Sequence, residues 1–331
     1  MKKLISIILV IVVMTCVVAC NKQQNGVIKV NEVTHSIFYA PFYVAIEKDY
    51  FEEEGLTIEL TNGGGSDASM TALLSGSSDI SLLGPETGIY TVLGDAKDKP
   101  VVFAQLTKRD GSFLVSRDLN EDFDWKKLKD KEIIAGRRGG SPAMSLEYAL
   151  NKNVLFDKEN VTLNFDIQFN LTTAAFESGT GDYVTMFEPT ASEYQRLNKG
   201  KIVASVGLES GEIPFTCFMA KQSYFDKNKE TLEKFTTALF KAIKFINDKP
   251  VEEVAKVLEK SFPSTTLQSI IDSINSYKNI DAWQTDMQMT KDSFTRLQDV
   301  MKNAGELDKT IEFNELINNE IANKTYKKVF G

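Results

Sequence analysis

Two adjacent arginines precede a glycine-rich turn in the stretch Arg137-Arg138-Gly139-Gly140-Ser141-Pro142. Pro142 suits the first position of a helix, and Ser141 suits its N-cap. The N–H groups of Gly140 and its neighbours, together with one guanidinium fork, are donors that would hold a carboxylate, sulfonate or phosphate. Only one of two consecutive arginines is expected to point into a cleft, and we predict that it is Arg138. A solvated pair of loop charges is the alternative interpretation.

A second glycine-rich loop, Gly63-Gly64-Gly65-Ser66, comes before a predicted helix whose N-cap is Ser66 or Asp67. Gly64 and Gly65 would let backbone N–H groups approach a ligand with no Cβ in the way. A helix N-terminus behind the loop favours an anionic group. The loop lacks the G-x-x-x-x-G-K-[ST] pattern of a nucleotide-binding P-loop. A plain flexible turn is the alternative interpretation.

Polar and aromatic side chains follow the first predicted strand at Ser36, Phe38 and Tyr39. Ser36 can donate or accept a hydrogen bond, and the two rings can stack on a planar ligand. The alternative is that both rings belong to the core beneath the loop. His35, the single histidine of the chain, is interpreted as structural rather than catalytic.

Further predicted ligand contacts lie near the ends of strands. Glu86 follows Gly84-Pro85, and its carboxylate could accept a hydrogen bond from an amine or ring N–H of the ligand. Equally, its charge could serve to complement a helix dipole. Glu188 follows a predicted strand and is expected to face the cleft. Gln105 lies at a crossing between lobes, where its amide could bind the ligand. We count Gly84 among the contacts as well.

The composition excludes several classes of protein. The chain is 42% hydrophobic and 25% charged, which is typical of a globular protein. Its net charge of −8 argues against nucleic-acid binding. One histidine and three cysteines disfavour both a Cys/His zinc site and a disulfide framework. No nucleophile has a base beside it, so we expect a protein without metal, cofactor or catalytic residues.

Strands and helices alternate along the first two thirds of the chain. Predicted strands over 27–30, 56–60 and 79–83 are separated by a helix over 43–51 and a second helix that begins near residue 66. A second β-α-β series begins at 132–136 and continues with strands over 164–169, 183–187 and 201–206. This order predicts an α/β protein with two doubly wound lobes.

The domain organisation follows from these two series. Residues 27–115 and 216–331 are expected to form lobe 1, and residues 116–215 to form lobe 2, joined by two extended crossings. Helices predicted over 227–247, 251–261, 266–276 and 291–304 should pack back onto lobe 1. Ligands bind at the carboxyl ends of parallel strands, so the cleft between the lobes is the expected site.

The N-terminus has the layout of an export signal. Lys2 and Lys3 precede an apolar run over 5–13, and a small residue stands before Cys20. This resembles a bacterial lipoprotein signal, which implies removal of residues 1–19 and lipidation of Cys20, with palmitate as an acyl chain. Residues 20–26 would tether an extracytoplasmic body to the cell membrane. A transmembrane anchor is the alternative, although the apolar stretch is short for one.

A family resemblance is carried by residues 34–56, THSIFYAPFYVAIEKDYFEEEGL. A polar and aromatic loop leads into an apolar helix that ends in Lys48-Asp49-Tyr50-Phe51, followed by Glu54-Gly55-Leu56. Gly63-Gly64-Gly65 and the later Leu74 to Ile80, LSGSSDI, continue the pattern. This resembles the nitrate/sulfonate/taurine and NMT1/THI5-like group of ABC-transporter substrate-binding proteins. Asp49 stands where that group usually has Gly.

The resemblance implies a periplasmic binding protein fold of type II and a binding function without catalysis. Such a protein, expected to be a monomer, would pass a small solute to an ABC permease driven by a separate ATPase. Together with the residues above, it implies a small anionic or planar heteroaromatic solute, similar to sulfonates, taurine or nitrate, or to the thiamine pyrimidine or riboflavin. A THI5-like pyrimidine-synthesis enzyme and a sensory module that presents its ligand to a receptor are the alternatives.

Overall fold

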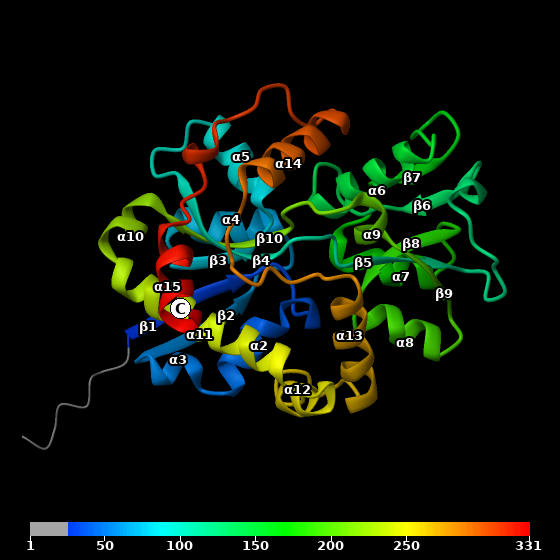
Figure 1. Cartoon of the computed structure of the whole chain (residues 1–331). Coiled ribbons are helices and arrows are strands. Elements are labelled where there is room, and N and C mark those ends of the chain that lie inside the picture. The colour runs from blue at the N-terminus through cyan, green and yellow to red at the C-terminus, as the bar shows by residue number, and fades with distance from the viewer. Residues whose placement is uncertain (1–25) are drawn as a thin grey trace, which may run out of the picture.

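Two five-stranded mixed sheets lie side by side and form two lobes (Figure 1). The computed structural model describes residues 26–331. The predicted signal peptide over 1–19, the predicted lipidation site Cys20 and tether residues 21–25 lie outside the described residues.

The first sheet has the strand order β2-β1-β3-β10-β4. Its strands are β1 (Gly26–Glu32), β2 (Leu56–Asn62), β3 (Ile80–Leu83), β4 (Pro100–Thr107) and β10 (Thr216–Lys221). Strand β1 lies between β2 and β3 and pairs in parallel with both, as the alternation of strands and helices predicts. Every residue of β3 is buried, because helices cover both faces of such a sheet.

The helices of the first lobe follow the carboxyl ends of its strands. They are η1 (Ile37–Tyr39), α2 (Ala40–Glu47), α3 (Tyr50–Glu53), α4 (Ser66–Ser75) and α5 (Pro85–Leu93). The prediction of a single helix over 43–51 is wrong in its bounds, because the helical conformation is interrupted at Asp49, between α2 and α3. Asp49 has φ 56°, a left-handed conformation that glycine adopts most readily.

The second sheet has the order β7-β6-β8-β5-β9. Its strands are β5 (Ser112–Ser116), β6 (Glu132–Ile134), β7 (Thr162–Asn164), β8 (Tyr183–Phe187) and β9 (Lys201–Ser205). The helical elements of this lobe are η2 (Trp125–Leu128), α6 (Ser141–Lys152), η3 (Phe169–Leu171), α7 (Thr172–Glu177), α8 (Thr190–Arg196) and α9 (Val206–Ser210).

Two short segments, 108–111 and 211–215, cross between the lobes and hold each other. Ile213 N donates to Lys108 O at 3.0 Å, and Phe215 N donates to Thr107 O at 3.1 Å. Each crossing leads into an antiparallel strand, β5 in the second sheet and β10 in the first. The predicted boundary at residue 115 therefore falls inside β5, whereas the predicted boundary at 216 coincides with the start of β10.

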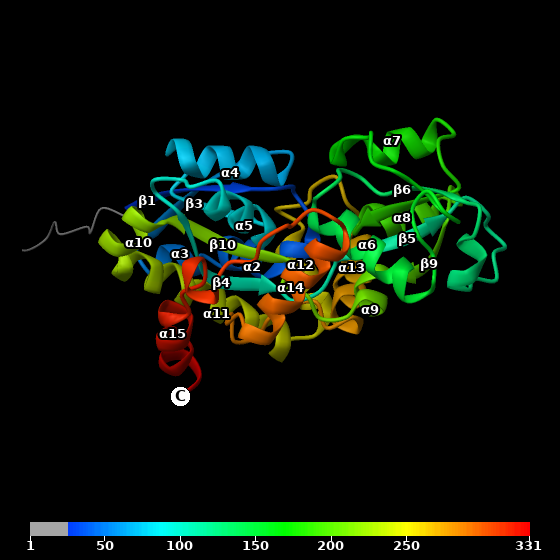
Figure 2. The ribbon, with the colours of Figure 1, turned by 90° about the horizontal axis from the view of Figure 1, so that it is seen from above.

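The C-terminal third is helical, as predicted. It contains α10 (Gln222–Lys227), α11 (Lys229–Asp248), α12 (Val251–Leu258), α13 (Leu267–Asn279), α14 (Lys291–Asn303), η4 (Phe313–Glu315) and α15 (Glu320–Phe330). Helix α11 packs on α2 and α3 of the first lobe, but α13 also contacts α8, and α14 contacts α6. The segment therefore packs on lobe 1 and also reaches lobe 2. In Figure 2, α4 and α7 lie at the top of the view and α15 lies at the bottom. Side chains of α4, α5 and α14 share one hydrophobic cluster on the first sheet, whereas those of α2, α3 and α11 belong to a second cluster. Across residues 26–331, no helix has the length and apolar character that a membrane span requires.

Candidate ligand-binding site

A cavity of about 200 Å³ lies between the two lobes. Its wall is built by loops that follow parallel strands of both sheets, where ligands of such folds bind. Predicted contacts that lie in the wall are Tyr39, Gly64, Gly65, Gly84, Glu86, Gly140 and Ser141.

Three helices start at the wall of the cavity, and each has a glycine at its N-cap. Gly65 precedes α4, Gly84 precedes α5 and Gly140 precedes α6. The predicted caps Ser66 or Asp67 and Ser141 are therefore wrong by a residue or two. Because glycine has no side chain to cap the first turn, backbone N–H groups of these helices remain available to other acceptors.

Glu86 is buried in the wall and is 1% exposed. Ser141 Oγ, from the opposite lobe, donates to Glu86 Oε2 at 2.6 Å. Burial raises the pKa of the Glu86 carboxyl, whereas Ser141, backbone N–H groups and the nearby Arg137 act in the opposite direction. The carboxylate thus links α5 to α6 across the cleft.

Arg137, rather than the predicted Arg138, lies in the wall. Arg137 Nε is 3.2 Å from Asp67 Oδ2, so this ion pair joins the lobes at the mouth of the cavity. The Arg138 guanidinium instead lies 3.8 Å from the centre of the Phe165 ring, and its Nη2 is 3.5 Å from Asp157 Oδ2. The sequence correctly indicates one inward arginine but identifies the wrong one.

Aromatic side chains form much of the apolar wall, but Phe38 is not among them. Tyr39, Phe169, Phe187 and Phe215 line the cavity. Phe38 is 1% exposed, and its ring centre lies 5.0 Å from that of Tyr277. Phe38 therefore packs in the core beneath the cavity, so the alternative interpretation holds for Phe38, whereas Tyr39 also lines the cavity.

Three other predicted contacts also point elsewhere. Ser36 Oγ donates to the backbone oxygen of Glu188 at 2.9 Å and accepts from Phe38 N. The Glu188 carboxylate accepts from Ser192 N at 2.9 Å and from Ser192 Oγ at 2.7 Å, so it caps α8 instead of facing the cavity. Gln105 Nε2 donates to Thr107 O at 3.1 Å beneath the wall. Of these hydrogen bonds, the one from Ser36 to Glu188 joins the two lobes, and the others lie within one lobe.

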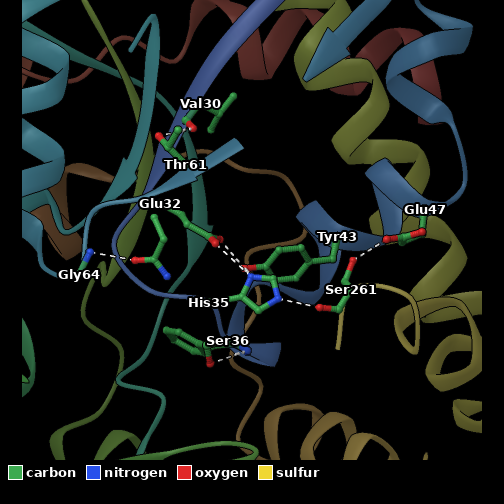
Figure 3. Close-up of polar contacts among 11 residues, drawn as sticks. Val30, Glu32, His35, Ser36, Tyr43, Glu47, Thr61, Gly64 and Ser261 are labelled. Atoms are coloured by element: carbon green, nitrogen blue, oxygen red, sulfur yellow. Dashed lines mark hydrogen bonds and ion pairs between the residues drawn. The ribbon is translucent and has the colours of Figure 1, made fainter. Parts of the chain in front are cut away.

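His35 ties the site loop to the C-terminal helices (Figure 3). His35 Nε2 lies 2.7 Å from Ser261 O, and Nδ1 lies 3.0 Å from Glu32 Oε1. Tyr43 Oη donates to the other oxygen of Glu32. Nε2 donates to the Ser261 carbonyl, and protonation of Nδ1 would add a donor toward the Glu32 carboxylate. The hydrogen bond to Glu32 accordingly raises the pKa of His35.

Sequence reasoning missed several residues of the wall. Thr172, Thr185 and Thr216 contribute hydroxyl groups, and Gln168 contributes an amide. Thr185 lies within β8 and Thr216 opens β10, where single polar residues in apolar strands are the signal that would have found them. Together, the wall offers donors, acceptors, a guanidinium and aromatic faces, which suits recognition of a small polar solute.

Comparisons with known proteins place the chain in a family. A family model described as "NMT1/THI5 like" matches residues 37–253. The chain is 44% identical over 315 residues to "Putative binding protein YtlA" of Bacillus subtilis (strain 168). The aligned region covers 95% of this chain and 94% of the relative. The chain belongs to the NMT1/THI5-like family. The resemblance seen in residues 34–80 is thereby confirmed, and the relative's name agrees with a binding protein rather than an enzyme.

Solved structures of low sequence identity share the fold. The alkanesulfonate-binding protein SsuA from Xanthomonas axonopodis pv. citri, bound to MOPS, is 14% identical with a TM-score of 0.72, covering 89% of this chain and 98% of that chain. The periplasmic nitrate-binding protein NrtA from Synechocystis PCC 6803 is 13% identical with a TM-score of 0.74, covering 92% of this chain and 89% of that chain. The NMT1/THI5-like chain therefore has the periplasmic binding protein fold, as expected.

Proposed function

We propose that this chain is the extracytoplasmic solute-binding lipoprotein of an ABC importer, and that it acts as a monomer. The observation that carries the proposal is the cavity between the lobes, which is walled by three helix N-termini and by residues of both sheets. The names of the relative and of the solved structures support a binding role. A permease with a separate ATPase would receive the solute.

The size and chemistry of the cavity narrow the solute. Its volume of about 200 Å³ is below the roughly 300–1,000 Å³ typical of drug-sized ligands, which favours a single ring over a tricyclic flavin. The faces of Phe187 and Phe215 suit a planar ring, and Arg137 suits a negative substituent at the mouth. The proposed ligand is therefore a small, planar heteroaromatic solute.

Calorimetric titration tests this function. The full chain, purified in detergent, is titrated with an alkanesulfonate, an aminopyrimidine and a flavin. We expect binding heat with one-to-one stoichiometry from at least one of the two smaller solutes, and no binding heat from the flavin. Heat from none of the three would refute the proposed ligand class.

Membrane anchoring is tested separately through Cys20. If Cys20 carries the lipid, Cys20→Ala removes the acyl chains that hold the protein at the membrane. We expect the variant to move from the membrane fraction to the soluble fraction, as measured by fractionation and immunoblotting. A Cys217→Ala variant should stay with the membrane, since Cys217 is buried in the fold. Retention of both variants in the membrane fraction would contradict lipidation at Cys20.

A further inference from the structure

We propose that Glu86 determines the specificity of the cavity by selecting solutes that present N–H donors, such as amino-substituted rings or amidinium groups, and by rejecting oxyanions. This inference rests on the proposed solute-binding function. It goes further by choosing between the anionic and heteroaromatic ligands that the sequence leaves open.

Gly84 makes room for the Glu86 carboxylate. A Cβ at Gly84 would lie 2.0 Å from Glu86 Oε2 and 2.6 Å from Cδ, well inside any tolerated contact. The carboxylate can therefore fold back against the turn between β3 and α5 because the N-cap residue of α5 is a glycine. The first lobe thus provides the space for the carboxylate, and Ser141 of the second lobe provides its hydrogen-bond donor.

The carboxylate stands where an oxyanion would otherwise bind. Ser141, the first residue of α6, donates its Oγ to Glu86 Oε2 at 2.6 Å. The backbone N–H groups of Ser141 and of Glu86 itself also lower the pKa of this carboxyl, so both helix starts act on it. A helix N-terminus carries partial positive charge and attracts anions. Here the Glu86 carboxylate, an anion that belongs to the chain itself, lies at the start of α6.

The other charged side chains of the wall do not offer an oxyanion an alternative binding site. Arg137 and Asp67 pair at the mouth, with side chains 33% and 66% exposed, whereas Glu86 is buried. The wall described here thus has two carboxylates against one guanidinium. An oxyanion inside it would meet like charge at low dielectric.

A solute with N–H donors would complement Glu86. A carboxylate offers about four acceptor positions, so the bond from Ser141 leaves capacity for a donor from the cavity. Hydrogen bonds between a carboxylate and a cationic donor are short and strong, and planar amidinium or amino groups present two donors at once. Burial raises the pKa of Glu86, and a bound cation would favour its ionised form.

Calorimetry with four probes tests the proposal. The full chain in detergent is titrated with benzamidinium, 4-aminopyrimidine, ethanesulfonate and nitrate. We expect the wild type to bind the first two probes more tightly than the two oxyanions. Glu86→Gln, which keeps the shape but removes the charge, should weaken benzamidinium binding at least about 10-fold, the scale of one charge-assisted hydrogen bond.

A second variant gives a readout of opposite sign. Glu86→Ala frees the start of α6, so ethanesulfonate affinity should rise at least about 10-fold while benzamidinium affinity falls. Glu188→Gln is the matched control, because Glu188 is also a buried acid but caps α8 outside the wall. We expect it to leave all four affinities unchanged, and thermal melts verify that each variant is folded.

The outcomes separate this inference from the proposed function. If the wild type binds oxyanions as tightly as amino or amidinium probes, or if the Glu86 variants do not shift that preference, Glu86 selectivity is overturned while solute binding stands. If neither the wild type nor any folded variant binds any probe, the proposed ligand class fails together with this inference.

Discussion

Gly84 and Glu86 act as one unit at the scale of residues. The missing Cβ of Gly84 allows the carboxylate to reach the start of α6, so a residue without a side chain controls the charge that faces the cavity.

Gly84→Ala should therefore displace the Glu86 carboxylate. We expect a loss of about 1–3 kcal/mol in the free energy of unfolding, the usual cost of overpacking, measured by urea denaturation. Affinity for benzamidinium should fall as well. Gly65→Ala is the control, since a Cβ there meets no atom within 4 Å. Equal stability of the two variants would contradict the account of Gly84.

His35 gives a second prediction because the chain has a single histidine. The hydrogen bond to Glu32 raises the pKa of His35 above 6.5. The stability contributed by the imidazolium is therefore fully present below pH 6.5 and is lost as the pH rises through the folded-state pKa. The single imidazole resonance in an NMR titration should report that raised pKa. A titration midpoint at or below 6.5 would refute this prediction.

His35→Gln provides the matching stability measurement. The ring is partly exposed, so we expect a loss of only about 1 kcal/mol at pH 5.5 and a smaller loss at pH 9. Urea denaturation of the wild type and the variant at both pH values measures the difference. A loss independent of pH would show that the ring contributes through packing alone.

The limits of sequence reasoning are visible at Arg137 and Arg138. The Gly-rich composition of their loop predicts a bend beside a helix start, but which arginine faces inward depends on the turn conformation. Gly136 and Gly139 have φ of 79° and 72°, and these values set the direction of the two side chains between them. Phe38 shows a similar limit, because its contact with Tyr277 comes from a helix far along the chain.

At the scale of elements, the order of strands and helices could be predicted because apolar runs bounded by glycine are local signals. The interruption between α2 and α3 could not be predicted, because the apolar periodicity continues across Asp49 although the helical backbone conformation does not. The antiparallel direction of β5 and β10 also could not be predicted from the sequence. It follows from each crossing strand entering its sheet at the edge where parallel strands end.

Asp110 lies in the first crossing and makes this element sensitive to pH. Burial raises the pKa of its carboxyl from 3.8 to about 7, although Ser112 N donates to Oδ1 at 2.6 Å. The protonated carboxyl therefore contributes stability that is fully present below pH 3.8 and is lost as the pH rises through about 7.

Asp110→Asn keeps the acceptor and removes the titration. We expect the variant to exceed the wild type in free energy of unfolding by at least about 1 kcal/mol at pH 8, with a smaller difference at pH 5. Urea denaturation at both pH values measures this, and other titrating groups cancel in the comparison. A difference that is equal at the two pH values would contradict the assignment to Asp110.

At the scale of the whole molecule, contacts on several levels join the lobes. Glu86 meets Ser141 inside the cavity, Arg137 meets Asp67 at its mouth, and Tyr90 Oη donates to Gly139 O at 3.1 Å beside it. Helices α13 and α14 contact α8 and α6 from the C-terminal segment. A solute that adds contacts to both lobes would stabilise this arrangement by its differential affinity for it.

A crystal structure of the chain grown with benzamidinium tests the central claim most directly. We predict electron density for the solute in the cavity between the lobes, with its nitrogen atoms within about 3.2 Å of the Glu86 carboxylate, the reach of a hydrogen bond. Density at another surface with the cavity unchanged, or a solute whose nitrogen atoms point away from Glu86, would contradict the account.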